Sequence, residues 1–404
     1  MSNFAHRFAP ILMALTVLIA ACEPKAAIKP PPDKPGDPTL ATVGSVSITT
    51  NYLKIAFANL PADAREEFRS DEGKRRFLEK QIDLIAYYSE GVRRNWKQNA
   101  DFRNAMSVVE KTALVFMAKE RAAAKLPPVS DEDVRAAHER YAQKARAAGR
   151  EPKSFEDAAA SMRAAIERQR FRHAGQDRVV ALMKDYGAAE HRTLLDTDPK
   201  DAAKNAELRQ VVVASRAFEL TLVEFYAWVA RQSPAYQEQA KTKEGRNWLL
   251  DRYLEDEFLH IDALTQQLHK DDEYATRMLV AEIGILGRMA QERITEKNIK
   301  ATGDEARAYL AANPDRFADK TWEKDEEEIR RAATDAKRTR IVKEFADALR
   351  RDRYVVAYRE DAVAALDLAA VTDAGIEAIM PERPGESAEA LDFSDLIEDA
   401  PAGN

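Results

Sequence analysis

Cysteine and glycine are scarce in this chain of 404 residues, and each scarcity excludes a class of protein. The single cysteine, Cys22, rules out an intramolecular disulfide, so stability must come from the core or from a membrane partner. Only 14 glycines are present, and long stretches of alternating polar and apolar residues are missing. Alanine, glutamate, lysine and arginine, which favour helices, are abundant instead. The composition therefore predicts a mainly α-helical protein.

Catalytic and nucleic-acid-binding motifs are also missing from the sequence. The histidines of the body do not have the spacing of metal ligands, and neither a Gly-x-Ser-x-Gly motif nor a glycine-rich phosphate loop occurs. Nine acids and one base give the last segment a charge of −8, against −7 for the whole chain, so the body is near neutral. A near-neutral body without a basic stripe argues against a nucleic-acid partner. We name no catalytic residue, no metal site and no cofactor.

The N-terminal residues have the pattern of an export signal. An apolar run follows Arg7 and ends in Ile19-Ala20-Ala21-Cys22, which resembles a bacterial lipobox. This pattern predicts that residues 1–21 are a signal peptide and that a lipid on Cys22 anchors a periplasmic protein to a membrane. Glu23 stands where an aspartate would signal retention in the inner membrane, which favours the outer membrane. The alternative is an ordinary signal peptide with an incidental cysteine.

Two further segments differ in composition from the body. Residues 22–40 contain six prolines and are expected to form an extended stalk. Residues 370–404 are predicted to be a disordered acidic tail, with a docking peptide as the alternative. A short amphipathic patch of the tail contains Leu391, Phe393, Leu396 and Ile397.

The body between these segments is internally repeated. A shift of 172 residues, which lays Gly245 on Gly73, also lays residues 289–293 on 117–121. No gap is needed from Thr49 to Ala136, after which the second copy loses about five residues and Trp322 corresponds to Phe155. The repeat predicts two tandem helical modules.

The two modules are expected to share one order of elements. Module one is assigned to residues 41–195 and module two to residues 208–365, each with a small strand pair. A short helix and a longer amphipathic helix follow, then a third helix, a fourth helix and a long last helix. The fourth helices open at Ser130 and Thr302, each followed three residues later by an acid, which predicts a capped N-terminus.

This order resembles the N-terminal chaperone domain of SurA-type and PrsA-type foldases of the bacterial envelope. The segments that carry the resemblance include ATVGSVSITTNYL, VSDEDVRAAHERY and SFEDAAASMRAAIERQR. It covers most of residues 41–195 and, more faintly, 211–361. The resemblance implies a chaperone that binds unfolded envelope proteins.

Two other functions stay open at this point. Family members that isomerise prolyl bonds carry a further parvulin domain with a histidine pair and a glycine-rich segment, and the sequence lacks both features. A peptidyl-prolyl cis-trans isomerase is therefore one alternative, and an assembly lipoprotein with one fixed protein partner is another.

A helical module of this kind is expected to bind peptides through aromatic and methionine side chains, which adapt to many apolar sequences. Core packing is the alternative role for each of them. The candidate residues are Phe57, Phe68, Trp96, Phe116, Tyr226, Trp228, Phe258 and Met289.

Overall fold

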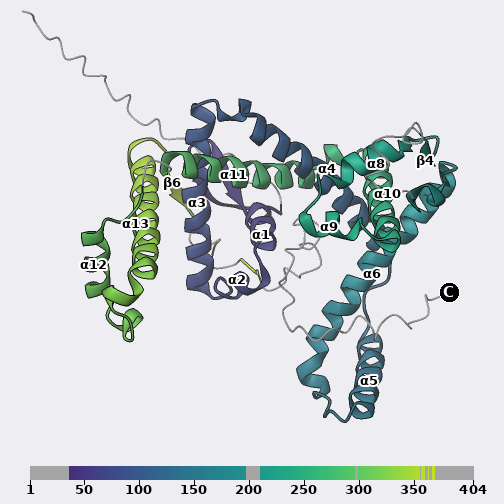
Figure 1. The fold of residues 1–404 in the computed structure, drawn as a ribbon, viewed down its shortest axis with the longest axis horizontal. Coiled ribbons are helices and arrows are strands. Elements are labelled where there is room, and N and C mark those ends of the chain that lie inside the picture. The colour runs from purple at the N-terminus through teal and green to yellow at the C-terminus, as the bar shows by residue number, and fades with distance from the viewer. Residues whose placement is uncertain are drawn as a thin grey trace, which may run out of the picture.

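The computed structural model describes residues 36–196, 210–295, 299–354, 356–359, 363 and 366–368. The predicted signal peptide, Cys22, the stalk before residue 36 and the acidic tail lie outside the described residues. The prediction of a mainly helical protein is confirmed (Figure 1). Within the described ranges, none of the helices is both long and apolar enough to cross a lipid bilayer.

The two copies of the repeat contain the same order of α-helices and strands, and differ in η2 of copy one and η5 of copy two. Copy one comprises β1 (Thr39–Val43), β2 (Val46–Thr49), α1 (Thr50–Ala58), α2 (Ala62–Glu66), α3 (Asp71–Arg93), η1 (Trp96–Gln98), α4 (Ala100–Ala123), α5 (Asp131–Ala147), α6 (Phe155–Asp185), β3 (Ala189–Glu190) and η2 (Arg192–Asp196). Copy two comprises β4 (Val211–Ala214), β5 (Glu219–Thr221), α8 (Leu222–Val229), α9 (Pro234–Gln239), α10 (Lys243–Thr265), η4 (Leu268–Lys270), α11 (Asp272–Thr295), α12 (Gly303–Ala312), η5 (Asp315–Phe317), α13 (Trp322–Asp352) and β6 (Val356–Tyr358).

The correspondence extends to details of the backbone. The bounds of α10 and α11 follow those of α3 and α4 at the same shift of 172. The turn after α3 and the turn after α10 each contain a left-handed residue, Asn95 and Gln267, both at φ 59°. The predicted caps at Ser130 and Thr302 are confirmed, because each forms a reciprocal capping box with the acid three residues later.

The two copies exchange halves. The long helix α3 of copy one packs on α11 of copy two, and α10 of copy two packs on α4 of copy one. Lobe one therefore combines β1, β2 and α1–α3 with α11–α13 and β6, whereas lobe two combines α4–α6 and β3 with β4, β5 and α8–α10. In Figure 1 the green α11 crosses the dark blue α3 on the left, whereas the blue α4 runs toward α8 and α10 on the right. The main hydrophobic core of each lobe contains residues of both copies.

The small sheets show the same exchange. The first has the strand order β2-β1-β6 and the second has the order β3-β4-β5, with all neighbouring strands antiparallel. The strand pair expected from each copy is present in each sheet, and the third strand comes from the end of the other copy. The exchanged strand closes one edge of the pair and ties the two copies together.

A helical arm projects from each lobe. Helices α5 and the first half of α6 form one arm, and α12 with the first half of α13 forms the other (Figure 1). Each arm has its own small core, centred on Met162 in the first and on Ile329 in the second. The arms are therefore extensions of the lobes with independent packing.

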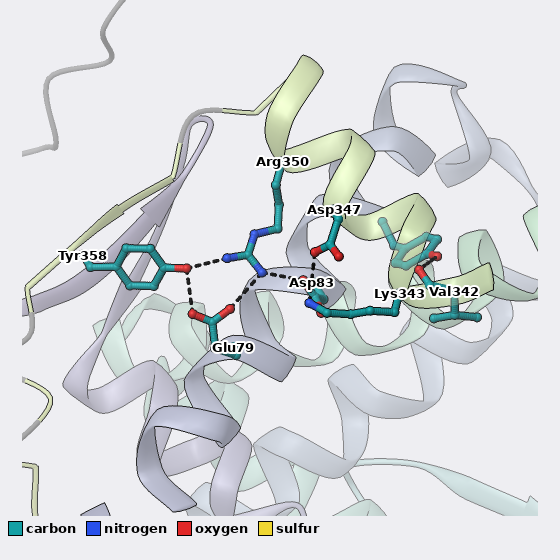
Figure 2. A network of polar contacts seen from close by, with 8 residues as sticks. Glu79, Asp83, Val342, Lys343, Asp347, Arg350 and Tyr358 are labelled. Atoms are coloured by element: carbon teal, nitrogen blue, oxygen red, sulfur yellow. Dashed lines mark hydrogen bonds and ion pairs between the residues drawn. The ribbon is translucent and has the colours of Figure 1, made fainter. Parts of the chain in front are cut away.

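A polar network fastens the end of copy two to copy one in lobe one (Figure 2). Arg350 on α13 donates to the carboxylates of Glu79 at 2.8 Å and Asp83 at 2.9 Å, both on α3. The Tyr358 hydroxyl on β6 donates to Glu79 at 2.7 Å. Figure 2 shows the guanidinium lying between the three partners. The network thus joins α3, α13 and β6.

Candidate functional site

Four of the eight candidate peptide-binding residues are core residues. Phe57 and Phe68 are 1% and 3% exposed and lie in the core of lobe one, and Phe258 is fully buried in lobe two. Phe116 is buried on α4, where its ring lies 5.5 Å from that of Phe171 on α6. These side chains offer no surface to a ligand in this structure.

Trp96 and Met289 are half-buried against the core of lobe one. The guanidinium groups of Arg94 and Arg293 both lie over the Trp96 ring, at 5.4 Å and 5.2 Å from its centroid. Such cation–π contacts occupy the faces of the ring. Trp96 is therefore engaged by its own chain.

Tyr226 and Trp228, the remaining two candidates, lie half-buried on α8 of lobe two. They belong to a continuous series of seven aromatic rings, which we call the aromatic ladder. Neighbouring ring centroids are 5.2–6.4 Å apart, within the range of favourable aromatic contact. The order of rings along the ladder is Tyr186, Phe258, Phe218, Tyr253, Trp228, Phe225 and Tyr226.

The aromatic ladder has no counterpart in lobe one. The shift of 172 residues relates the ladder residues between 218 and 258 to positions in lobe one. Tyr186 is related by a shift of 167, the same that relates Phe155 to Trp322. None of the equivalent residues is aromatic. These equivalents are Arg353, Ala86, Val46, Gln81, Ala56, Leu53 and Lys54. Lobe one has its own aromatic residues, but several of them, including Tyr52, Phe57 and Phe77, are fully buried. Among the described residues, lobe two has a connected series of rings with half-buried members, and lobe one has none at the equivalent positions.

The packing of the helices also leaves lobe two more open. In lobe one α1 packs against α11, and Val280 of α11 is 7% exposed within the core. Among the described residues of lobe two, α8 makes no comparable contact with α4, and the equivalent residue Val108 is 67% exposed. The part of α4 around Val108 is consequently not covered by α8.

At two positions where lobe one has buried apolar side chains, lobe two has charged side chains. Ile85 and Ile283 are fully buried in lobe one, and their equivalents in lobe two are Glu257 and Lys111, which form an ion pair at 2.5 Å. Burial, together with the charge of Glu257, raises the pKa of Tyr253 on the same face of α10. The ion pair and the half-buried tyrosine hydroxyl place polar groups beside the aromatic ladder.

His260, one turn further along α10, completes this polar edge. Burial is the main cause that lowers its pKa, and the positive charge of Lys111 lowers it further. The imidazole is therefore neutral at pH 7 and can both donate and accept a hydrogen bond.

We call the combined area of aromatic ladder, Val108, Lys111, Glu257 and His260 the lobe-two face. Of its members, the candidate list drawn from the sequence contained only Tyr226, Trp228 and the buried Phe258. Phe218 and Tyr253 were missed because each looks like an ordinary core residue in its own stretch of sequence. The signal that finds them is the comparison of the copies, since aromatic residues stand in copy two where copy one has none.

The described residues hold no group of three or more metal-ligating side chains. Comparison of the chain with models of known protein families, with curated proteins and with solved structures finds no match. What the lobe-two face offers is apolar contact area with a polar edge, which suits the binding of a polypeptide segment.

Proposed function

We propose that the protein is a lipid-anchored, chaperone-like protein of the bacterial envelope that binds extended or unfolded polypeptides on the lobe-two face. The observation that carries the proposal is the aromatic ladder, in which five of the seven rings are half-buried, at positions where lobe one has no aromatic residue. Rigid aromatic side chains provide large contact areas at low entropic cost, and they accept many apolar sequences. The lipobox at Cys22 and the resemblance to envelope foldases support the location and the kind of client.

The arrangement of the molecule is consistent with this use. Lobe one is sealed and starts immediately after the expected stalk, so it can serve as the support nearest the anchor. Lobe two presents the open face, and the arm of α5 and α6 extends from that same lobe (Figure 1).

Suppression of aggregation tests the proposal. An outer-membrane β-barrel protein, diluted from urea, is followed by light scattering with an equimolar amount of the mature chain. We expect the wild type to suppress aggregation and the double variant Tyr226→Ala/Trp228→Ala to lose most of that effect. Trp322→Ala is the matched control, because this tryptophan lies in the arm of lobe one, against Arg307 and Arg330.

Two outcomes would contradict the proposal. One is wild-type protein that leaves aggregation unchanged, and the other is a double variant as active as the control. A pull-down from envelope extract that yields one stoichiometric partner would favour the assembly function instead. Faster turnover of a prolyl peptide in a protease-coupled assay would favour the isomerase.

A further inference from the structure

The arm formed by α5 and the first half of α6, which we call arm one, ends in a cluster of bases (Figure 1). Residues 144–153 contain four bases and one acid. The four bases, which are all exposed and which we call the basic tip, are Lys144, Arg146, Arg150 and Lys153. Lys144 and Arg146 lie in the last turn of α5, where positive charge favours the helix dipole, but Arg150 and Lys153 lie beyond the end of the helix. The helix dipole therefore accounts for only half of the cluster.

The arm formed by α12 and the first half of α13, arm two, lacks this cluster. The last turn of α12 contains no base, and the turn that follows, residues 313–321, has two bases and two acids. Both bases are engaged within the arm, since Arg316 donates to the Tyr309 hydroxyl at 2.9 Å and Lys320 pairs with Glu328. The basic tip lies in the stretch where copy one is about five residues longer than copy two, so it is a feature of copy one alone.

The bases of the other strongly basic stretch on an arm are mostly ion-paired. Residues 329–343 of α13 contain six bases and one acid. Five of these bases pair with acids of the body, namely Arg330, Arg331, Lys337, Arg340 and Lys343. Among the described residues, by contrast, no acid pairs with Arg146, Arg150 or Lys153. An acidic ligand at the basic tip would therefore not have to displace an ion pair of these three bases.

Two half-buried aromatic side chains lie beside the basic tip. The Tyr141 hydroxyl accepts a hydrogen bond from the Lys153 amide at 3.4 Å, and the Phe155 ring centroid lies 6.0 Å from the Arg135 guanidinium. Both rings contact His138, at 6.1 Å and 5.5 Å between ring centroids. The end of arm one therefore combines positive charge with apolar ring surface, which suits a ligand with acidic and apolar side chains.

The end of the acidic tail has the complementary composition. Residues 384–404 contain six acids and no base. Apolar residues stand among these acids, in the order Leu391-Asp392-Phe393-Ser394-Asp395-Leu396-Ile397. This segment is the candidate docking peptide of the sequence, and the basic tip matches it in both charge and apolar character.

The tail is long enough to reach the basic tip. The described chain ends at Leu368 in the core of lobe one. From that core a route to Phe155 follows α11, α4 and α6, which pack on one another in this order. At about 1.5 Å per residue along the helices and about 9 Å for each crossing, this route is about 70 Å long, and the direct distance is shorter. The 23 residues between Leu368 and Asp392 span up to about 80 Å when extended.

We propose that residues 384–404 bind the basic tip of arm one of the same chain. The acids of the tail pair with the bases, and Phe393 packs beside Tyr141 and Phe155. Because the tail leaves the body at lobe one and binds on the arm of lobe two, it ties the two lobes together through charge pairs that salt weakens. This inference does not depend on polypeptide binding at the lobe-two face.

The distance between a label at the tip and a label in the tail tests the proposal. Cys22 is the only cysteine, so the mature chain with Cys22→Ser, Ala148→Cys and Ser394→Cys carries one spin label at the tip and one in the tail. Double electron–electron resonance at low ionic strength should give a narrow distribution, with most distances below about 40 Å, half the extended reach of the tail. Sodium chloride at about 1 M, which cuts the Debye length to about 3 Å, should broaden the distribution and shift it to longer distances.

Charge reversal at the tip supplies the matched comparison. Arg146→Glu/Arg150→Glu should give the broad distribution even at low ionic strength. Arg331→Glu/Arg340→Glu changes the net charge equally, at α13 side chains that are 74% and 66% exposed, and should keep the narrow distribution. Asp392→Lys/Asp395→Lys alters no residue of the body and should act like the tip variant, so the test stands even if the tip variant fails to fold.

Three results would overturn the inference. The first is a broad distribution for the wild-type sequence at low ionic strength, and the second is a narrow one that neither the tip variant nor the tail variant changes. The third is a loss of the short distances on about tenfold dilution into unlabelled chain, because the contact would then join two chains. Cosedimentation with phosphatidylglycerol vesicles that requires Arg146 and Arg150, together with a distant tail label, would assign the tip to a membrane surface instead.

Discussion

Glu90 and Asp262 occupy the same position in the two copies, and each is a buried carboxylate held by an arginine through two hydrogen bonds. Glu90 is 1% exposed and accepts from Arg93 at 2.8 Å and 2.6 Å. Asp262 is 3% exposed and accepts from Arg178 at 2.9 Å and 2.6 Å. Arg178 lies on α6 of copy one, so its pair with α10 fastens the exchanged elements of lobe two.

Removing Asp262 should weaken lobe two. Asp262→Ala leaves the partly buried Arg178 without its main partner, and we expect the free energy of unfolding to fall by about 3 kcal/mol. Urea unfolding followed by circular dichroism measures the change. Glu238→Ala is the control, since Glu238 and Lys241 are 70% and 67% exposed, and it should cost less than about 1 kcal/mol. Equal effects of the two variants would contradict the structural role of Asp262.

The ionisation of Glu90 should make the stability of the protein depend on pH in the acid range. Hydrogen bonds from Arg93, and after them those from Arg94, lower the pKa of Glu90 from 4.5 to about 2. Because the folded pKa lies below the unfolded one, this stabilisation is present above pH 4.5 and is lost as pH falls toward 2. The shift corresponds to about 3 kcal/mol, so Glu90→Gln should show a flatter decline of stability between pH 5 and pH 2. A decline as steep as that of the wild type would refute this assignment.

The ionisation of Glu120 should make the stability of the protein fall, rather than rise, as the pH increases toward neutral. Burial raises the pKa of this α4 carboxyl to about 7, even though Arg277 of α11 donates to it at 3.0 Å. The folded state therefore holds the proton more tightly than the unfolded state, and stability decreases as pH rises from about 5 to 7.

Melting temperatures of Glu120→Gln and the wild type, measured from pH 5 to pH 8, check this effect. The difference between variant and wild type should rise with pH in favour of the variant. Glu156→Gln, which removes an exposed carboxylate of α6, is expected to give a constant difference. A constant difference for Glu120→Gln as well would show that its ionisation is not coupled to folding.

Two equivalent glycines permit close packing at the start of the long helices. A Cβ atom on Gly73 would lie 2.5 Å from the Glu67 carbonyl oxygen, and one on Gly245 would lie 2.0 Å from the Gln239 carbonyl oxygen. We expect each alanine variant to lower the free energy of unfolding by about 1–3 kcal/mol in a thermal melt. Gly284→Ala, which meets its nearest atom at 3.9 Å, should instead stabilise α11 by up to about 1 kcal/mol.

Much of the local structure could be predicted from the sequence because the two copies are similar. An element predicted in one copy is supported by the same pattern in the other. The shift of 172 residues, the two capping boxes and the start of the last helices at Phe155 and Trp322 all agree with the structure. Each of these features depends on neighbouring residues, whose propensities and hydrogen bonds act locally.

The exchange of halves could not be predicted in the same way. Amphipathic spacing shows which face of α3 is apolar, but α4 and α11 present similar faces because they descend from one sequence. The choice between them depends on the direction in which the chain enters η1 and η4, directly after Asn95 and Gln267 with their left-handed backbone. The lobe-two face depends on that choice, since it combines α4 of one copy with α8 and α10 of the other.

Hydrogen–deuterium exchange of the full chain, with and without an unfolded outer-membrane β-barrel protein, tests most directly whether polypeptide binds to lobe two. We expect protection of amides in α8 and α10 on addition of the client, and no change in the equivalent helices α1 and α3. Protection that is equal in both lobes, or confined to α1 and α3, would contradict the assignment of binding to the open lobe.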